Sequence, residues 1–229
     1  MKHDGSAGVP FAAETVFGDR LPLAEQYAHL LATEGVERGL IGPRETERIW
    51  DRHIMNCAAV GELIPLDARV ADVGSGAGLP GIPLAIARPD LDITLIEPML
   101  RRTTFLQDVI DGLALESMTV LRHRAEERIV LDQADFDYAT SRAVAPLDKL
   151  TRWTVPLLKP NGIMLALKGD RAQAEIDEHG ALMASLGVAD VKVMRCGVEY
   201  LDPPATVVVA QRSAERAQRK RKSSGRRAR

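Results

Sequence analysis

A glycine-rich loop is the first part of this sequence that could do chemistry. Gly74 ends the apolar run RVADVG at residues 69–74, and Gly76 and Gly78 follow it, ahead of a helix-like stretch at 80–87. Glycine lets the backbone turn sharply and lets a ligand approach without meeting a side chain. Ligands of open parallel sheets bind at the carboxyl ends of strands. The loop is therefore a candidate ligand site, because a plain turn does not require three glycines and their cost in conformational entropy.

The spacing within this loop also matches that of dinucleotide enzymes. Gly76, Gly78 and Gly81 form a G-x-G-x-x-G pattern, and Glu97 follows 19 residues after Gly78, where a ribose-binding acid would stand. At a strand end, the Glu97 carboxylate could accept both ribose hydroxyls or could simply face solvent. A nicotinamide-dependent oxidoreductase is therefore one candidate.

Three residues around the glycines favour a cationic ligand instead. Pro80 and Pro83 remove two amide donors from the first helical turn, where a pyrophosphate needs them. Asp72, two residues before Gly74, places a carboxylate at the strand end that would repel a pyrophosphate. S-adenosylmethionine carries an ammonium and a sulfonium but no phosphate, so the loop favours a methyltransferase.

The elements that position this loop follow an alternating pattern from about residue 66. Short apolar runs predict strands at 69–74, 92–98, 118–123, 136–143 and 162–169. Helix-like stretches lie between them at 80–87, 100–113, 147–158 and 171–186. Such alternation predicts an α/β fold with a parallel sheet covered on both faces.

The end of the pattern differs. Residues 189–197 and 205–212 are strand-like runs with no helix between them, so they predict a hairpin that adds an antiparallel strand. A mostly parallel seven-stranded sheet with its last strand reversed is the arrangement of Rossmann-like class I methyltransferases. Residues 1–64 are expected to form a helical N-terminal extension, and 65–212 the cofactor-binding domain.

Composition indicates a cytoplasmic globular protein. Of its 229 residues, 45% are hydrophobic and 27% charged, and no apolar run approaches the roughly 20 residues that span a bilayer. The N-terminus lacks the apolar core of a secretory signal. Cys57 and Cys196 are far apart and in no motif, so we expect buried thiols and no metal site.

Charge is strongly segregated along the chain. Residues 213–229 hold eight basic residues and one acid, a net of +7, while the whole chain has a net charge of −2, which leaves residues 1–212 at −9. Apolar residues are scarce beyond Arg212, so this tail is predicted to be disordered when free. A basic tail seeks phosphate without reading sequence, which makes it a candidate arm for RNA.

Five segments resemble one known family. They are the run at 72–106, RIWDRHI at 48–54, Arg124-Ala125-Glu126, FDYATSRA at 136–143 and LALKG at 165–169. Together they resemble the ribosomal small-subunit methyltransferase G family, also called glucose-inhibited division protein B, over roughly residues 40–212. The GLPGIPLAI and SRA elements are fairly specific to that family, whereas the glycine triplet is not.

The resemblance implies methyl transfer from S-adenosylmethionine to nitrogen 7 of a guanine, position 527 in the 530 loop of 16S ribosomal RNA. It implies cofactor contacts at Gly74, Leu79, Ala125, Glu126 and Arg142, with Asp72, Gly76 and Glu97 as neighbours. With Gly78 from the loop, these residues form the predicted cofactor site. Glu97-Pro98 stands where many relatives have an aspartate and a small polar residue.

Two cations at predicted strand ends are candidate catalytic residues. Nitrogen 7 carries a lone pair and no proton, so we expect positioning and electrostatics rather than a general base. Arg142 is predicted to bind the cofactor carboxylate in preference to clamping the guanine edge. Lys168 is predicted to contact RNA phosphate or oxygen 6 of the base, or to be merely solvated. His53 is expected to be a packing residue in preference to an RNA contact.

Other readings remain open on the sequence alone. Beside the oxidoreductase, the chain could be a ribosome-assembly factor that binds RNA and keeps the fold without the chemistry. Its partner is expected to be 16S ribosomal RNA within the 30S subunit, although free RNA fits as well. We expect a monomer that does not bind membranes.

Overall fold

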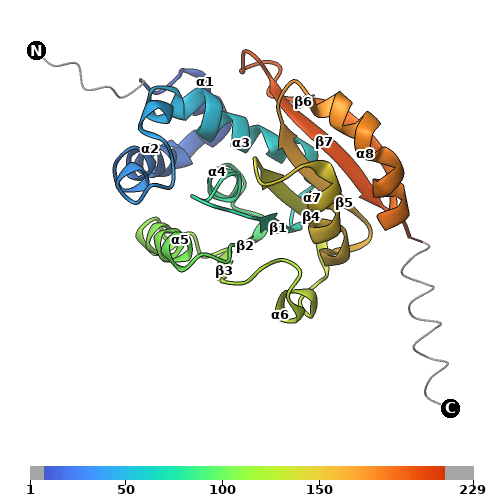
Figure 1. Ribbon diagram of the computed structural model, residues 1–229. Coiled ribbons are helices and arrows are strands. Elements are labelled where there is room, and N and C mark those ends of the chain that lie inside the picture. The colour runs from blue at the N-terminus through green and yellow to red at the C-terminus, as the bar shows by residue number, and fades with distance from the viewer. Residues whose placement is uncertain (1–7, 215–229) are drawn as a thin grey trace, which may run out of the picture.

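The computed structural model describes residues 8–214, so the basic run at 216–229 lies outside it. Helices cover both faces of a seven-stranded sheet (Figure 1). Its strands are β1 (Arg69–Val73), β2 (Asp92–Ile96), β3 (Met118–Leu121), β4 (Phe136–Arg142), β5 (Leu158–Lys168), β6 (Val188–Cys196) and β7 (Ala205–Arg212). All seven predicted strands are confirmed.

The strand order is β3-β2-β1-β4-β5-β7-β6. Strands β1 to β5 pair in parallel, and β7 pairs antiparallel with both β5 and β6. The predicted final hairpin is therefore confirmed. The chain runs outward from β1 to β3 and then crosses back to β4, so the strand order reverses between β1 and β4. Open α/β sheets bind ligands at such a switch point, beyond the carboxyl ends of the strands.

The helices fall where the sequence predicts them, with one addition. They are α1 (Ala12–Phe17), α2 (Leu21–Leu30), α3 (Asn56–Ala58), α4 (Gly81–Ala87), α5 (Leu100–Gly112), α6 (Arg128–Leu131), α7 (Leu147–Thr154) and α8 (Ala172–Leu186). Helix α6 is a single turn that buries only Val130 fully, too short to leave a periodic signal. No helix between residues 8 and 214 is long and apolar enough to cross a membrane.

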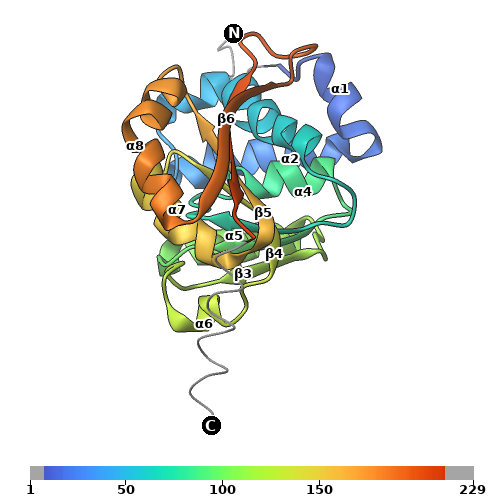
Figure 2. The same ribbon diagram turned by 90° about the vertical axis from the view of Figure 1, so that its right-hand side faces the viewer.

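Alternation along the strands creates two apolar cores. On β5, Leu165 and Leu167 face the core shared by the N-terminal helices, α4 and α5, whereas Met164 and Ala166 face the core under α7 and α8. The two views agree that α7 and α8 lie on the other side of the sheet from α2 and α4 (Figures 1 and 2). The N-terminal extension thus belongs to the same apolar core as the helices that flank the glycine loop.

The segment predicted as a helix over 43–64 is helical but irregular. It runs from a 3₁₀ turn (Pro43–Arg48) through a π-helical turn (Ile49–Met55) and α3 into a second 3₁₀ turn (Ala59–Leu63). Apolar spacing near the helical period does not distinguish these windings from a regular α-helix. The π-helical turn contains the WDRH residues, and single π turns inside helices often occur at functional sites.

Strand β5 begins earlier than the sequence predicts. Leu158 was expected to end the preceding helix but pairs instead with Phe136 of β4. The α-helix stops at Thr154, and a 3₁₀ turn with Pro156 leads into the strand. The register shifts between Phe136 and Tyr138, which explains why the apolar pattern is interrupted there.

Candidate functional site

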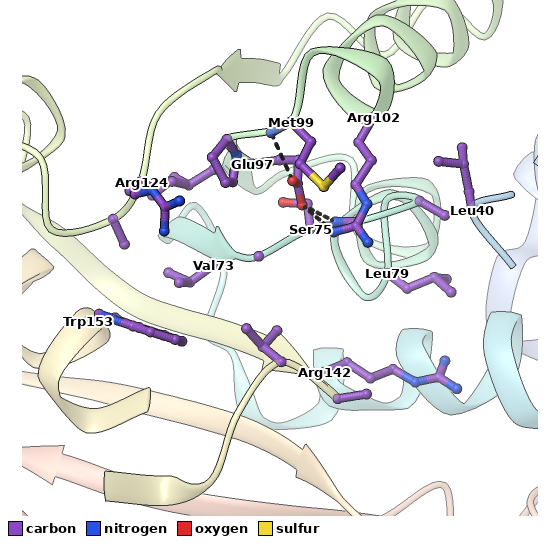
Figure 3. Close-up of a pocket in the computed structure, with 18 of the residues that line it drawn as sticks. Leu40, Val73, Ser75, Leu79, Glu97, Met99, Arg102, Arg124, Arg142 and Trp153 are labelled. Atoms are coloured by element: carbon purple, nitrogen blue, oxygen red, sulfur yellow. Dashed lines mark hydrogen bonds and ion pairs between the residues drawn. The ribbon is translucent and has the colours of Figure 1, made fainter. Parts of the chain in front are cut away.

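A cavity of about 700 Å³ opens beyond the carboxyl ends of β1, β2, β3 and β4. Figure 3 shows Glu97 and Arg142 on opposite sides of it, with Arg124 and Trp153 at one end and Leu40 and Leu79 at the other. Seven of the nine predicted cofactor-binding residues line it: Gly74, Gly76, Leu79, Glu97, Ala125, Glu126 and Arg142. The topology therefore brings these residues to one place, whereas Asp72 and Gly78 lie outside the lining.

The glycine loop is held in place by hydrogen bonds from several elements. The Gly74 amide donates to the Ile96 carbonyl at the end of β2 (2.9 Å), and the Tyr27 hydroxyl of α2 donates to the Ala77 carbonyl (2.8 Å). Gly78 has a φ of +98°, and a Cβ there would lie 2.3 Å from Ile82 and 3.0 Å from the Tyr27 hydroxyl. Gly78 therefore shapes the loop from behind while its neighbours face the cavity.

Tyr27 was not identified from the sequence. Its side chain is fully buried, and burial raises the pKa of its phenol well above the ordinary value, so it remains a neutral donor. It lies 50 residues before the Ala77 carbonyl that it contacts, and no motif marks it. The N-terminal extension thus supports the glycine loop directly.

Asp72 lies beneath the loop rather than in the cavity. Its side chain is fully buried, and its carboxylate accepts from the Gly81 amide (3.1 Å) and the Thr140 hydroxyl (3.4 Å). A Cβ on Gly81 would come within 2.8 Å of this carboxylate and 2.4 Å of Leu95, so only glycine fits. Burial raises the pKa of Asp72 to about 7. Asp72 therefore joins β1 to the start of α4 and to β4, and does not line the cavity.

Glu97 is a buried carboxylate in the cavity wall. It is 1% exposed, and its two oxygens accept from the Gly76 amide (3.0 Å) and the Met99 amide (3.1 Å). Arg102 of α5 adds a contact of 3.3 Å to the same side chain (Figure 3). The predicted alternative of a solvent-facing acid is therefore wrong. These three contacts use three of the roughly four lone pairs of a carboxylate, so Oε1, which accepts only from Met99 among the described residues, keeps one for a further donor.

Arg142 leaves the end of β4 and is directed toward the N-terminal extension. Its Nη1 donates to the Cys57 thiol of α3 at 3.1 Å. Cys57 is buried, and burial raises its pKa, so the acceptor is a thiol rather than a thiolate. Cys196 is also a buried free thiol, as predicted for both cysteines. The guanidinium of Arg142 thus provides a fixed positive charge on the cavity side opposite Glu97.

Lys168 lies outside the cavity lining. Its Nζ donates to the Ala145 carbonyl and to Glu175 of α8, both at 2.8 Å, and the side chain is 12% exposed. Glu175 also accepts from the Leu147 amide at the start of α7 (3.2 Å). These contacts fasten the segment after β4 to α8. They give Lys168 a structural role beside the predicted contact with RNA.

His53 and Glu45 of the N-terminal extension also line the cavity. His53 is 7% exposed, and its Nε2 lies 2.9 Å from a Glu45 carboxylate oxygen. Burial, followed by the charge of Arg142, lowers the pKa of His53 to about 4. The ring is therefore neutral near pH 7 and donates from Nε2 to Glu45. The sequence favoured a packing role for His53 over an RNA contact, and nothing in it connected Glu45 with the cavity.

The chain matches the family model described as rRNA small subunit methyltransferase G over residues 20–202. It is 58% identical to a protein of Mycolicibacterium smegmatis named ribosomal RNA small subunit methyltransferase G, over 100% of this chain and 97% of that protein. A protein of Mycobacterium marinum with the same name is 59% identical over 93% of both chains.

Solved structures share the fold at low sequence identity. A SAM-dependent O-methyltransferase from Thermotoga maritima aligns with a TM-score of 0.54 at 14% identity, covering 69% of this chain and 65% of that one. A structure described as a predicted O-methyltransferase from Agrobacterium tumefaciens aligns with a TM-score of 0.55 at 20% identity, covering 70% and 80%. The predicted class I methyltransferase fold is confirmed.

Proposed function

This chain belongs to the rRNA small subunit methyltransferase G family, and on that premise we propose that it methylates nitrogen 7 of a guanine in 16S ribosomal RNA. Its methyl donor is S-adenosylmethionine. The observation that carries the proposal is the buried Glu97 carboxylate, fixed beside the glycine loop in a cavity at the switch point of the sheet. We further propose that the chain acts as a monomer in the cytoplasm on RNA within the 30S subunit.

The residues of the cavity fit this donor. Glu97 would accept from a ribose hydroxyl through its remaining lone pair, and Ile96 and Ala125 offer apolar surface for the adenine. The Arg142 guanidinium would bind the carboxylate of the methionine part. A phosphate-bearing carrier fits poorly, because Pro80 and Pro83 provide no amides at the start of α4. S-adenosylmethionine supplies a methyl group bonded to a positively charged sulfur.

The residues of this chain would contribute positioning rather than proton transfer. Nitrogen 7 of guanine has a free lone pair, so no side chain must remove a proton before attack. The glycine loop, held by Tyr27 and Asp72, would set how far the methyl donor lies from the ends of the strands. Arg142 would set the orientation of the donor. Such orientation contributes several kcal/mol to lowering a barrier. A carboxylate held by hydrogen bonds, such as Glu97, does not have to reorient as positive charge moves from sulfur to the purine during methyl transfer.

The direct test is to map methylated guanines in 16S ribosomal RNA from cells that lack this protein. Mass spectrometry of RNA fragments should show one 7-methylguanine missing, restored by the wild-type chain. Arg142→Ala should restore it poorly, with both cofactor affinity and turnover reduced about tenfold or more. An unchanged methylation map without the protein would contradict the proposed function, and full activity of Arg142→Ala would contradict the role of this arginine.

A further inference from the structure

The N-terminal extension contributes a wall of the cavity that the cofactor-binding loops do not. This wall consists of Leu40, Ile41, Glu45, Arg52 and His53. Figure 3 places Leu40 across the cavity from Arg124 and Trp153, at the end away from the loop that follows β3. One end of the cavity thus has the nucleoside-binding groups, and the other has charged and apolar groups from a different part of the chain.

Glu45 is the acidic side chain of this second wall. Three carboxylates line the cavity among the described residues: Glu45, Glu97 and Glu126. Glu97 follows β2 and Glu126 follows β3, where the proposed function places the ribose and adenine of the donor. Only Glu45 remains, within residues 8–214, as a lining carboxylate that could recognise the substrate.

Two neighbours orient the Glu45 carboxylate and leave acceptor capacity on both of its oxygens. Its Oε2 accepts from His53 Nε2 at 2.9 Å and lies 3.5 Å from Arg52 Nε. Within the described part of the chain no group pairs with Oε1. Because His53 is neutral near pH 7, it holds the carboxylate without cancelling its charge. The π-helical turn Ile49–Met55 places Arg52 and His53 next to one another at this site.

The chemistry of guanine matches a carboxylate at this position. For nitrogen 7 to meet the methyl donor, the opposite edge of the base must face away from it. That edge carries two adjacent donors, N1–H and the N2 amine, whereas a carboxylate offers two adjacent acceptors. Adenine has an acceptor at N1 and no N2 amine, so a carboxylate rejects it. Enzymes that modify a base commonly recognise its Watson–Crick edge within a pocket.

We propose that Glu45, oriented by His53, recognises the N1–H and N2 amine of the target guanine in the cavity beside the N-terminal extension. Leu40 and Ile41 of the same wall supply apolar surface against which a base can pack. Arg142 lies near His53, at the border between the donor and the base. The proposal rests on the proposed function and names the group that sets its base specificity.

The test compares Glu45→Gln with wild type on two substrates. These are 30S subunits reconstituted with 16S RNA that carries guanosine or inosine at the target position. Inosine keeps nitrogen 7, O6 and N1–H but lacks the N2 amine. Glutamine offers one acceptor and one donor, so kcat/KM on guanosine should fall about 10- to 100-fold. For wild type, kcat/KM on the inosine substrate should be about tenfold lower than on the guanosine substrate. For E45Q, the two values should differ by less than about threefold.

Two measurements separate recognition from a structural effect. Glu47→Gln changes an exposed acid on the same 3₁₀ turn, outside the cavity lining, and should behave as wild type on both substrates. Cofactor affinity of E45Q by calorimetry should match wild type within twofold. If E45Q is unstable in a thermal melt, Glu45→Asp replaces it, and this variant must retain the preference for guanosine over inosine.

The outcomes distinguish this inference from the function on which it rests. If wild type transfers no methyl group to the guanosine substrate, the proposed function fails and the inference with it. If wild type is active but replacing guanosine by inosine lowers kcat/KM by the same factor in E45Q and in wild type, the function stands and recognition by Glu45 is refuted. A large loss of cofactor affinity in E45Q would assign the carboxylate to the ammonium of the donor and also refute it.

Discussion

Replacing Asp72 by asparagine should change how the stability of this protein depends on pH. Burial raises the pKa of this carboxyl from the ordinary 3.8 to about 7. Between these values the folded chain holds a proton that the unfolded chain releases, so the free energy of unfolding falls as the pH rises. One pKa unit corresponds to about 1.4 kcal/mol. The full effect is therefore about 4 kcal/mol, of which roughly 2–3 kcal/mol develops between pH 5 and pH 8.

Asparagine is neutral at every pH and retains an oxygen that can accept from the Gly81 amide. The unfolding free energy of Asp72→Asn minus that of wild type should therefore rise by roughly 2–3 kcal/mol from pH 5 to pH 8. Urea denaturation of both proteins at pH 5, 6, 7 and 8 measures this difference. If the free energies of unfolding of the two proteins change in parallel with pH, the claim that Asp72 is desolvated beneath the loop is refuted. If the difference between them falls as the pH rises, the pKa of Asp72 is lowered rather than raised by folding.

Three further predictions concern the loop, the ribose contact and the tail. Tyr27→Phe removes the donor to the Ala77 carbonyl, so urea denaturation should show a free energy of unfolding lower by about 1–2 kcal/mol. Calorimetry of the same variant should show a weaker affinity for S-adenosylmethionine, and unchanged affinity would show that the loop keeps its shape without this hydrogen bond. Glu97→Ala should weaken that affinity about tenfold or more, whereas equal affinity would exclude Glu97 from the ribose site. Deleting residues 213–229 should weaken RNA binding and make the affinity less dependent on salt concentration, while the affinity for the cofactor stays unchanged. An unaltered salt dependence would show that the tail does not contact RNA phosphates.

The mostly parallel sheet was accessible from the sequence because buried parallel strands leave continuous apolar runs. The runs at β1, β2 and β4 lie between helix-length stretches, and right-handed crossovers then leave few arrangements. The hairpin of β6 and β7 was predictable for the opposite reason, since no helix separates the two strands. The glycine loop and Glu97 were also predictable, since each stands at a strand end.

The other wall of the cavity was not predictable, because it depends on contacts distant in the sequence. Glu45 enters the site through an irregular helical segment whose winding is set by packing rather than by its apolar spacing. Tyr27 reaches the loop across 50 residues. Nothing in the sequence indicated that Lys168, which the strand-end argument directed toward RNA, pairs with Glu175 on a helix that comes later in the chain. Position at a strand end predicts proximity to the cavity but not the direction of a long side chain.

The central claim is that the cavity holds a sulfonium methyl donor rather than a phosphate-bearing carrier. Titration calorimetry of the purified full-length protein with S-adenosylmethionine, and separately with oxidised nicotinamide adenine dinucleotide, tests it most directly. Saturable binding of S-adenosylmethionine at one site per chain is expected, weakened by Glu97→Ala, with no binding of the dinucleotide. Binding of the dinucleotide together with no heat from S-adenosylmethionine would contradict the account.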